Sequence, residues 1–246
     1  MKTSNILLLS LLGVILLSIT IILVSFSGEM SIGLAPENSA GKAEQLRNLP
    51  HFNKIEMESK FDVYYTQDTF QRVVVKTDSS LLNVAVTEVK DGKLYIHSNK
   101  RLRNRQHIDI ILTTDSIVKI EANAGSTFKT TRRMKVHQLD GNCNAGSIVK
   151  IDGEFFNLNL DFNAGSIADV TGTCVNLNVI ANAGTILNLG SLMAEKGVVS
   201  ANAGSIVTVN VAKELSVDAN AGSIVKSLGN PLMKGINIMG GAQFTK

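Results

Sequence analysis

Tryptophan is absent from this chain of 246 residues, aromatic side chains make up only 5% of it, and it has three prolines. So few aromatics leave Val, Ile, Leu and Ala to fill a core, which suits narrow β-coils better than a helical globule. The scarcity of proline and the lack of a low-complexity tract argue against extended disorder. The excess of positive charge is small, because 24 basic residues stand against 21 acidic ones. The composition therefore does not indicate nucleic acid binding.

What the chain does contain is one short phrase, Asn-Ala-Gly-Ser/Thr-Ile/Thr, repeated six times. The intervals between successive copies are 21, 19, 19, 20 and 18 residues. A period near twenty predicts a solenoid, in which each repeat is one coil that buries its apolar face by stacking on its neighbours. The asparagines and glycines of the six copies are Asn123, Gly125, Asn144, Gly146, Asn163, Gly165, Asn182, Gly184, Asn202, Gly204, Asn220 and Gly222.

Apolar residues alternate with polar ones on both sides of each phrase, and this period of two predicts strands. Apolar pairs occupy the positions three and one residues before the asparagine, for example Leu160/Phe162 and Val179/Ala181. Apolar pairs also occupy the positions five and seven residues after it, for example Leu187/Leu189. Each coil is therefore expected to hold two short strands joined at an Asn-Ala-Gly-Ser corner. We predict an all-β, right-handed parallel β-helix of about 20 residues per coil, with the hand given by the rule for parallel crossovers.

The corner residues suit a tight bend, because glycine adopts a positive φ at little steric cost and asparagine tolerates the left-handed region. Stacked corners are expected to form a ladder of asparagine amides and a second ladder of hydroxyls, and we interpret both as structural. The alternative is that the hydroxyls form a file on a flat face that binds a regular ligand such as a glycan or ice. These hydroxyls belong to Ser126, Ser147, Ser166, Thr185, Ser205 and Ser223.

The amino terminus holds an apolar run over residues 6–24, preceded by Lys2 and followed by Glu29. As a helix it would be about 28 Å long, close to the thickness of the hydrocarbon core. The positive-inside rule then leaves the rest of the chain outside the cytoplasm. Residues 1–27 are expected to be a signal peptide, cleaved before Gly28, or an uncleaved anchor that spans the membrane through residues 6–24.

The rest of the chain divides into four parts by composition and pattern. Residues 28–45 are small and polar and are interpreted as a linker. Residues 46–120 alternate as strands without a regular repeat and are expected to cap the first coil, with a hairpin or tight turn between two strands at residues 90–93. Residues 121–229 hold the regular repeats. Residues 230–246 break the repeat and are expected to form the second cap.

Several of these segments resemble a known family. Residues 47–55 read Arg-Asn-Leu-Pro-His-Phe-Asn-Lys-Ile, residues 61–67 read Phe-Asp-Val-Tyr-Tyr-Thr-Gln, and residues 91–96 read Asp-Gly-Lys-Leu-Tyr-Ile. With the recurring small-residue turns, they make residues 46–244 similar to the putative auto-transporter adhesin, head GIN domain family of Bacteroidetes-type cell-envelope proteins. This resemblance implies a parallel β-helix behind a signal sequence, without established catalytic residues. The family's commoner turn is Ser-Gly-Ser, so a binding role is not carried over to the Asn-Ala-Gly-Ser corners.

A search for catalytic or metal-binding patterns yields little. The histidines stand in separate segments without ligand spacing, so we predict no metal site and no cofactor. Cys143 and Cys174 stand at different offsets from the nearest phrase and are expected to be buried free thiols, not a disulfide. Asp152 with Asp169, or Asp140 with Asp161, could approach on neighbouring coils as a glycan-cleaving enzyme requires, but a solvated outer face explains these residues equally well. The four histidines are His51, His97, His107 and His137.

Basic residues gather in two stretches about one coil apart, and His107 lies beside the first. We favour a solvated loop that protects the end of the stack. The functional alternative is a patch that binds anionic lipid headgroups or acidic polysaccharide. No aromatics that could stack on bases stand among these charges. The basic residues are Lys100, Arg101, Arg103, Arg105, Arg132, Arg133 and Lys135.

Taken together, these patterns predict an exported protein, periplasmic or on the cell surface, that is not an enzyme. The expected role is an adhesin-like binding module whose partner is an envelope polysaccharide, a lipid headgroup or another surface protein, and not a nucleic acid. A carbohydrate-active enzyme is the main alternative. A membrane-anchored envelope sensor or assembly factor is the other alternative, if the amino-terminal helix is retained.

Overall fold

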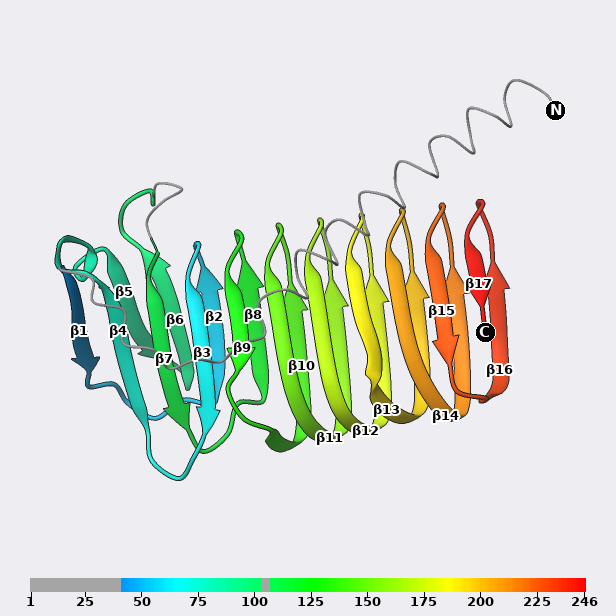
Figure 1. Cartoon of the computed structure of the whole chain (residues 1–246), viewed down its shortest axis with the longest axis horizontal. Helices are drawn as coiled ribbons and strands as arrows, with labels where there is room; N and C mark the ends of the chain where they lie inside the picture. The colour runs from blue at the N-terminus through cyan, green and yellow to red at the C-terminus, as the bar shows by residue number, and fades with distance from the viewer. Residues whose placement is uncertain (1–40, 103–106) are drawn as a thin grey trace, which may run out of the picture. The chain divides into compact units, whose positions relative to one another are not determined.

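The computed structural model describes residues 41–102 and 107–246 (Figure 1). The predicted signal or anchor over residues 1–27 lies outside the described residues, as does most of the predicted linker. The first strand begins at Lys42, four residues before the expected start of the folded part. The strands are β1 (Lys42–Arg47), β2 (Lys54–Glu58), β3 (Asp62–Gln67), β4 (Arg72–Asp78), β5 (Ala85–Lys90), β6 (Lys93–Ser98), β7 (Asp109–Thr114), β8 (Lys119–Asn123), β9 (Thr127–Thr130), β10 (Met134–Cys143), β11 (Ile148–Phe162), β12 (Ile167–Ala181), β13 (Ile186–Ala201), β14 (Ile206–Ala219), β15 (Ile224–Leu228), β16 (Leu232–Ile238) and β17 (Gln243–Thr245).

Residues 41–246 form the predicted parallel β-solenoid, with the corners aligned along one edge (Figure 1). The strands that enter the corners make one sheet, here called the entry sheet, and the strands that leave them make the exit sheet. β11 through β14 belong to both sheets. Each of them leaves one corner on the exit sheet, bends at the edge opposite the corners, here called the far edge, and enters the next corner on the entry sheet. Successive coils pair in parallel register, for example Leu160 with Val179 and Val149 with Ala168.

Alternation of apolar and polar residues positions the core between the two sheets. The inward columns that were predicted from the sequence are buried, including Phe162, Val179 and Ala181 on the entry sheet and Leu187 and Leu189 on the exit sheet. Each inward side chain packs on its counterpart in the coils above and below. Burial of these aliphatic columns is the main source of stability, at about 25 cal/mol per Å² of apolar area.

The amino-terminal coils are stacked in an order that differs from their order in the sequence. The coil of β2 and β3 lies between the coil of β6 and β7 and that of β8 and β9. Antiparallel strands then close this end, with β5 paired to β6 on the entry sheet and with β4 and β1 added to β7 on the exit sheet. The hairpin predicted at residues 90–93 joins β5 to β6, with Asp91 and Gly92 at φ values of 52° and 70°.

The carboxyl-terminal segment continues the solenoid, so the prediction of a second cap over residues 230–246 is wrong. β16 pairs in parallel with β14, and β17 pairs in parallel with β15. Between them lies a seventh corner, in which Gly240 and Gly241 have φ values of 59° and 77°. The amide of Gly222 donates to the carbonyl of Gly240 at 2.9 Å. The repeat was missed because this corner lacks the asparagine, yet it begins 19 residues after Asn220.

Candidate functional site: the outer surfaces of the solenoid

The six repeated corners are type I′ turns that bond to one another. In every copy the alanine has a φ between 51° and 54° and the glycine a φ between 70° and 73°. In five of the six copies the asparagine carbonyl accepts a hydrogen bond from the amide of the residue three positions on, as between Asn123 and Ser126 at 3.2 Å. The first five glycine amides donate to the alanine carbonyl of the next corner, with Gly184 to Ala203 at 3.0 Å as one example. The backbone alone therefore fixes the stacking of the corners.

The asparagine amides form a ladder along the corners with two interruptions. Asn144 donates to Asn123 at 3.2 Å, Asn182 to Asn163 at 3.0 Å and Asn202 to Asn182 at 3.1 Å. Asn163 instead donates to Asp161 at 2.9 Å, and Asn220 donates to Asp218 at 2.7 Å. These carboxylates stand two residues earlier on the same strand, and a charged acceptor forms a stronger hydrogen bond than an amide does.

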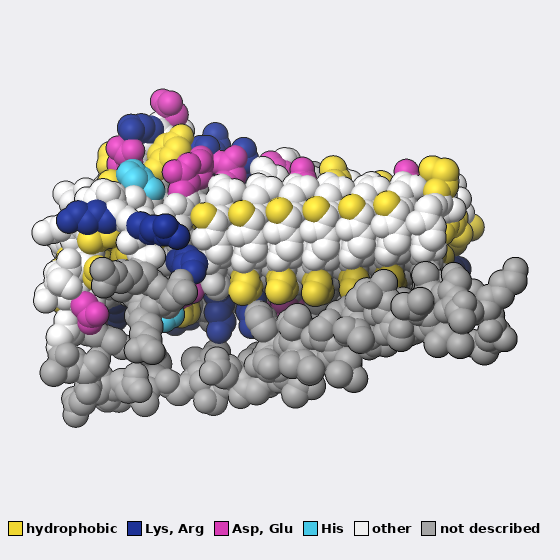
Figure 2. Space-filling view, turned by 90° about the horizontal axis from the view of Figure 1, so that it is seen from above, with side chains coloured by type: hydrophobic (Ala, Val, Ile, Leu, Met, Phe, Trp, Pro, Cys, Tyr) yellow, Lys and Arg dark blue, Asp and Glu magenta, His cyan; other side chains and the backbone are white. Residues whose placement is uncertain are grey.

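The hydroxyls of the corners point into the core, and all six residues are fully buried. Ser147 donates to the carbonyl of Ala122 at 2.8 Å, and Ser223 donates to that of Ala201 at 2.8 Å. The interpretation of an exposed hydroxyl file that binds a glycan or ice is therefore wrong. The corner edge instead presents alanine methyls and, beside them, a partly exposed file of isoleucines (Figure 2). The file consists of Ile148, Ile167, Ile186, Ile206 and Ile224.

The predicted basic patch is not one surface. Lys100 and Arg101 follow β6 at the corner edge, whereas Arg132 and Arg133 lie in the connection from β9 to β10 at the far edge. Arg103 and Arg105 lie outside the described residues. At the far edge, Arg133 forms an ion pair with Asp152 at 3.0 Å, and Lys135 forms one with Glu154 at 3.3 Å. The two stretches are one coil apart in the sequence but end on opposite edges, so they do not form a single anionic-ligand site.

Neither carboxylate pair considered from the sequence comes into register. Asp169 lies opposite Lys150, and Asp152 lies opposite Thr171. Asp140 lies opposite Asn159, which donates to it at 2.7 Å, and Asp161 lies opposite Asn142. Each of these acids therefore stands directly opposite a lysine, a threonine or an asparagine, and not opposite another acid.

The two cysteines are free and buried in different columns. Cys143 pairs with Phe162 across the sheet, whereas Cys174 pairs with Phe155 near the far edge. Burial raises the pKa of the Cys174 thiol to about 12 and also raises that of Cys143, so neither is a reactive thiolate at neutral pH. In the part of the chain that the structure describes, no three His, Cys, Asp or Glu side chains gather as a metal ion would require.

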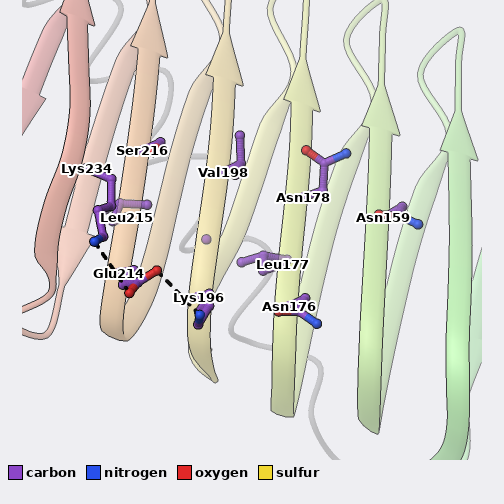
Figure 3. A pocket seen from close by; sticks show the side chains of 11 residues that line it. Asn159, Asn176, Leu177, Asn178, Lys196, Val198, Glu214, Leu215, Ser216 and Lys234 are labelled. Atoms are coloured by element: carbon purple, nitrogen blue, oxygen red, sulfur yellow. Dashed lines mark ion pairs between the residues drawn. The ribbon is translucent and has the colours of Figure 1, made fainter.

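A shallow groove crosses the outer surface of the entry sheet from β11 to β16 (Figure 3). One row across the strands consists of Asn159, Asn178, Val198 and Ser216, and its members are cross-strand partners. The groove has a volume of about 300 Å³. It adjoins a second depression between β13 and β16, and the two share Val198 and Ser216.

The second row of the groove is charged. Asn176, Lys196 and Glu214 are neighbours across β12, β13 and β14, and Lys234 follows on β16. Glu214 forms ion pairs with Lys196 at 3.5 Å and with Lys234 at 3.7 Å, so two cations flank one anion (Figure 3). Beside them, the side chain of Val198 is 54% exposed. The groove therefore offers amides, a hydroxyl, a local excess of positive charge and a small apolar platform.

Sequence reasoning missed this groove, although a signal for it was present. The tripeptide Asn-Leu-Asn occurs at residues 157–159 and again at residues 176–178, and its leucines occupy buried core positions. In a strand with a buried leucine between them, both asparagines must face outward. The repeat at an interval of 19 residues then places them side by side, and Asn176 donates to Asn157 at 2.9 Å.

Comparison with known proteins identifies the family. The family described as putative auto-transporter adhesin, head GIN domain, matches residues 51–231. The chain belongs to this family. The resemblance inferred from the sequence is thus confirmed for this head GIN domain. No match is found among curated proteins.

Solved structures share the fold of this head GIN domain. A putative adhesin from Bacteroides fragilis has a TM-score of 0.75 and 18% identity, over 87% of this chain and 99% of the other. A putative adhesin from Parabacteroides merdae has a TM-score of 0.68 and 11% identity, over 84% and 96%. A putative lipid binding protein from Parabacteroides distasonis has a TM-score of 0.60 and 16% identity, over 85% and 97%. At these identities the likeness shows the fold alone.

Across residues 41–102 and 107–246, this head GIN domain has no helix with the length and hydrophobicity needed to cross a membrane.

Proposed function

We propose that this head GIN domain is a non-catalytic binding module of the cell envelope, exported from the cytoplasm, and that its groove on the entry sheet binds an acidic polysaccharide. The observation that carries this proposal is the juxtaposition of Asn159, Asn178 and Ser216 with the row of Lys196, Glu214 and Lys234. The family's description as an adhesin supports a binding role.

The chemistry of the groove suits a sugar chain with carboxylate groups. Amides and a hydroxyl can donate to and accept from sugar hydroxyls, and the exposed Val198 can contact the apolar face of a ring. Lys196 and Lys234 supply one positive charge in excess of Glu214, and this favours an anionic sugar. The coils repeat at about 4.8 Å, so the groove is an extended surface and not a closed pocket.

The test is a glycan array followed by calorimetry with the acidic polysaccharides that bind, using the full chain and two matched variants. Asn178→Ala removes an exposed amide from the groove, whereas Asn188→Ala removes an exposed amide from the exit sheet. We expect Asn178→Ala to weaken binding about tenfold, as the loss of one or two hydrogen bonds to a ligand would. Asn188→Ala should bind as the unchanged chain does.

A second variant and an activity assay separate the alternatives. Lys196→Gln should weaken binding and reduce its dependence on salt, because the lysine acts through its charge. A reducing-sugar assay should detect no product, and release of sugar would overturn the non-catalytic assignment. Binding to vesicles of anionic lipid without binding to any polysaccharide would assign the groove to lipid headgroups instead. If Asn178→Ala and Asn188→Ala weaken polysaccharide binding equally, the binding site does not lie in the groove.

A further inference from the structure

Among the described residues, none covers the core at the carboxyl-terminal end of the solenoid. Ile236 pairs with Val217 and Ile238 pairs with Ala219, so both isoleucines continue inward columns. Val217 and Ala219 are 3% and 0% exposed, whereas Ile236 and Ile238 are 52% and 36% exposed. The neighbouring surface adds Met239, which is 55% exposed. Apolar columns that are buried along the whole stack therefore meet solvent at this end.

The amino-terminal end is built in the opposite way. Antiparallel strands β4 and β1 extend the exit sheet and β5 extends the entry sheet, and the segment that crosses from β4 to β5 buries Leu81 and Val84 between the sheets. Its outermost strands also carry charges. Glu44 on β1 forms an ion pair with Lys76 at 2.7 Å, Arg47 donates to the carbonyl of Leu82, and Glu88 and Lys90 form an ion pair on β5. Charges on edge strands are a common protection against pairing with another chain.

The last coil lacks such protection. Between residues 232 and 245 the sequence carries one charged side chain, that of Lys234. This lysine forms an ion pair with Glu214 of the preceding coil at 3.7 Å, so its ammonium group lies toward the stack and not at the open end. The outer edges of β16 and β17 thus offer unprotected backbone groups beside exposed apolar side chains. Such an edge is a template for strand addition.

We infer that this end binds a second copy of the chain, end to end, about a two-fold axis normal to the sheets. That axis sets β16 antiparallel to the partner's β16 and β17 antiparallel to the partner's β17, so both sheets continue across the interface. A partner must present two strand edges at the separation of the two sheets, and an identical end does so by symmetry. The charged strands β1 and β5 make the other end a poor partner, because apolar columns would face charges.

The experiment measures the oligomeric state of the full chain in detergent micelles by sedimentation velocity over a series of protein concentrations, which gives the dimer dissociation constant. Ile236→Lys places a charge in the uncovered column. Met193→Lys is the matched control, because Met193 is 61% exposed and lies away from this end. We expect a dimer for the unchanged chain and for Met193→Lys. Ile236→Lys should raise the dimer dissociation constant at least about tenfold, since two unpaired charges would be buried per dimer.

Three results would overturn the inference. The first is a monomeric unchanged chain, and the second is a dimer of equal strength with Ile236→Lys. The third is a ladder of larger oligomers, which would indicate head-to-tail stacking in place of a closed two-fold dimer. Circular dichroism of each variant controls for folding. Substitution of a side chain that is 52% exposed should leave the β-sheet spectrum unchanged.

Discussion

At each repeated corner an alanine adopts a backbone conformation that is unfavourable for it. The left-handed region costs a residue with a Cβ roughly 1 kcal/mol, and glycine or asparagine is the usual occupant of this turn position. All six alanines are nevertheless held there, with Ala183 at a φ of 53° and its side chain exposed to solvent. The glycine-to-alanine hydrogen bonds between successive corners fix this conformation, so the stack compensates for a local preference.

A substitution at one corner tests this account. Ala183→Asn should raise the free energy of unfolding by about 0.5–1 kcal/mol, because asparagine tolerates the left-handed region. Ala183→Val should lower it by about 1–2 kcal/mol, because a β-branched side chain is disfavoured there. Chemical denaturation measures both changes. Ala212→Asn is the control, since Ala212 is exposed within β14, and a stability gain there equal to that at Ala183 would contradict the account.

A partly buried carboxylate on the exit sheet gives a pH-dependent effect. Burial raises the pKa of Asp169, although Lys150 opposes this shift. The folded state therefore binds the proton more tightly than the unfolded chain does. Stability contributed by this group is present below the unfolded pKa of about 3.9 and is lost as the pH rises through the folded pKa.

Asp169→Asn should consequently raise the free energy of unfolding at pH 7, and this gain should disappear near pH 3. Urea denaturation at several pH values measures the trend. Asp152→Asn serves as the control, because it removes the ion pair with Arg133 and should give no gain at pH 7. A gain for Asp169→Asn that persists unchanged at low pH would exclude a desolvated charge as its cause.

At the scale of the elements, the regular coils could be predicted because each one contains the same short sequence motif. The phrase specifies a turn, and the alternation beside it specifies which side chains face inward. The order of the amino-terminal coils could not be predicted, since no local pattern states that the coil of β2 and β3 lies between two later ones. The seventh corner was missed because Met239 and Gly240 stand where the phrase has asparagine and alanine.

The surfaces were harder to predict than the core for a related physical reason. Spacing along the chain indicates which column a residue joins only when the coils are regular. The basic residues near Lys100 and Arg132 follow irregular strands. Their separation of about one coil in the sequence led to the wrong prediction that they share one surface. The groove asparagines follow regular strands, and the repeated tripeptide at residues 157–159 and 176–178 does indicate their shared face.

At the scale of the whole molecule, stability is expected to vary along the stack. In a solenoid each coil interacts only with its neighbours, so a central coil has two stabilising interfaces and a terminal coil has one. The amino-terminal end compensates for this with added antiparallel strands and with the segment between β4 and β5, which buries Leu81 and Val84. The carboxyl-terminal end has no such cover among the described residues, and its inward side chains at Ile236 and Phe244 are partly exposed.

Two phenylalanines in inward columns test this difference in stability between a central coil and the last coil. Phe162 is fully buried in a central coil, whereas Phe244 packs against the core from the last strand. Phe162→Ala should lower the free energy of unfolding by about 3–5 kcal/mol, as the removal of a buried ring commonly does. Phe244→Ala should lower it by about 1 kcal/mol, because the ring is already partly in water and the last coil can open without the rest. Denaturation at low protein concentration, where the inferred dimer is dissociated, gives the comparison. A loss at Phe244 as large as that at Phe162 would mean that the final coil is coupled to the stack as tightly as a central one.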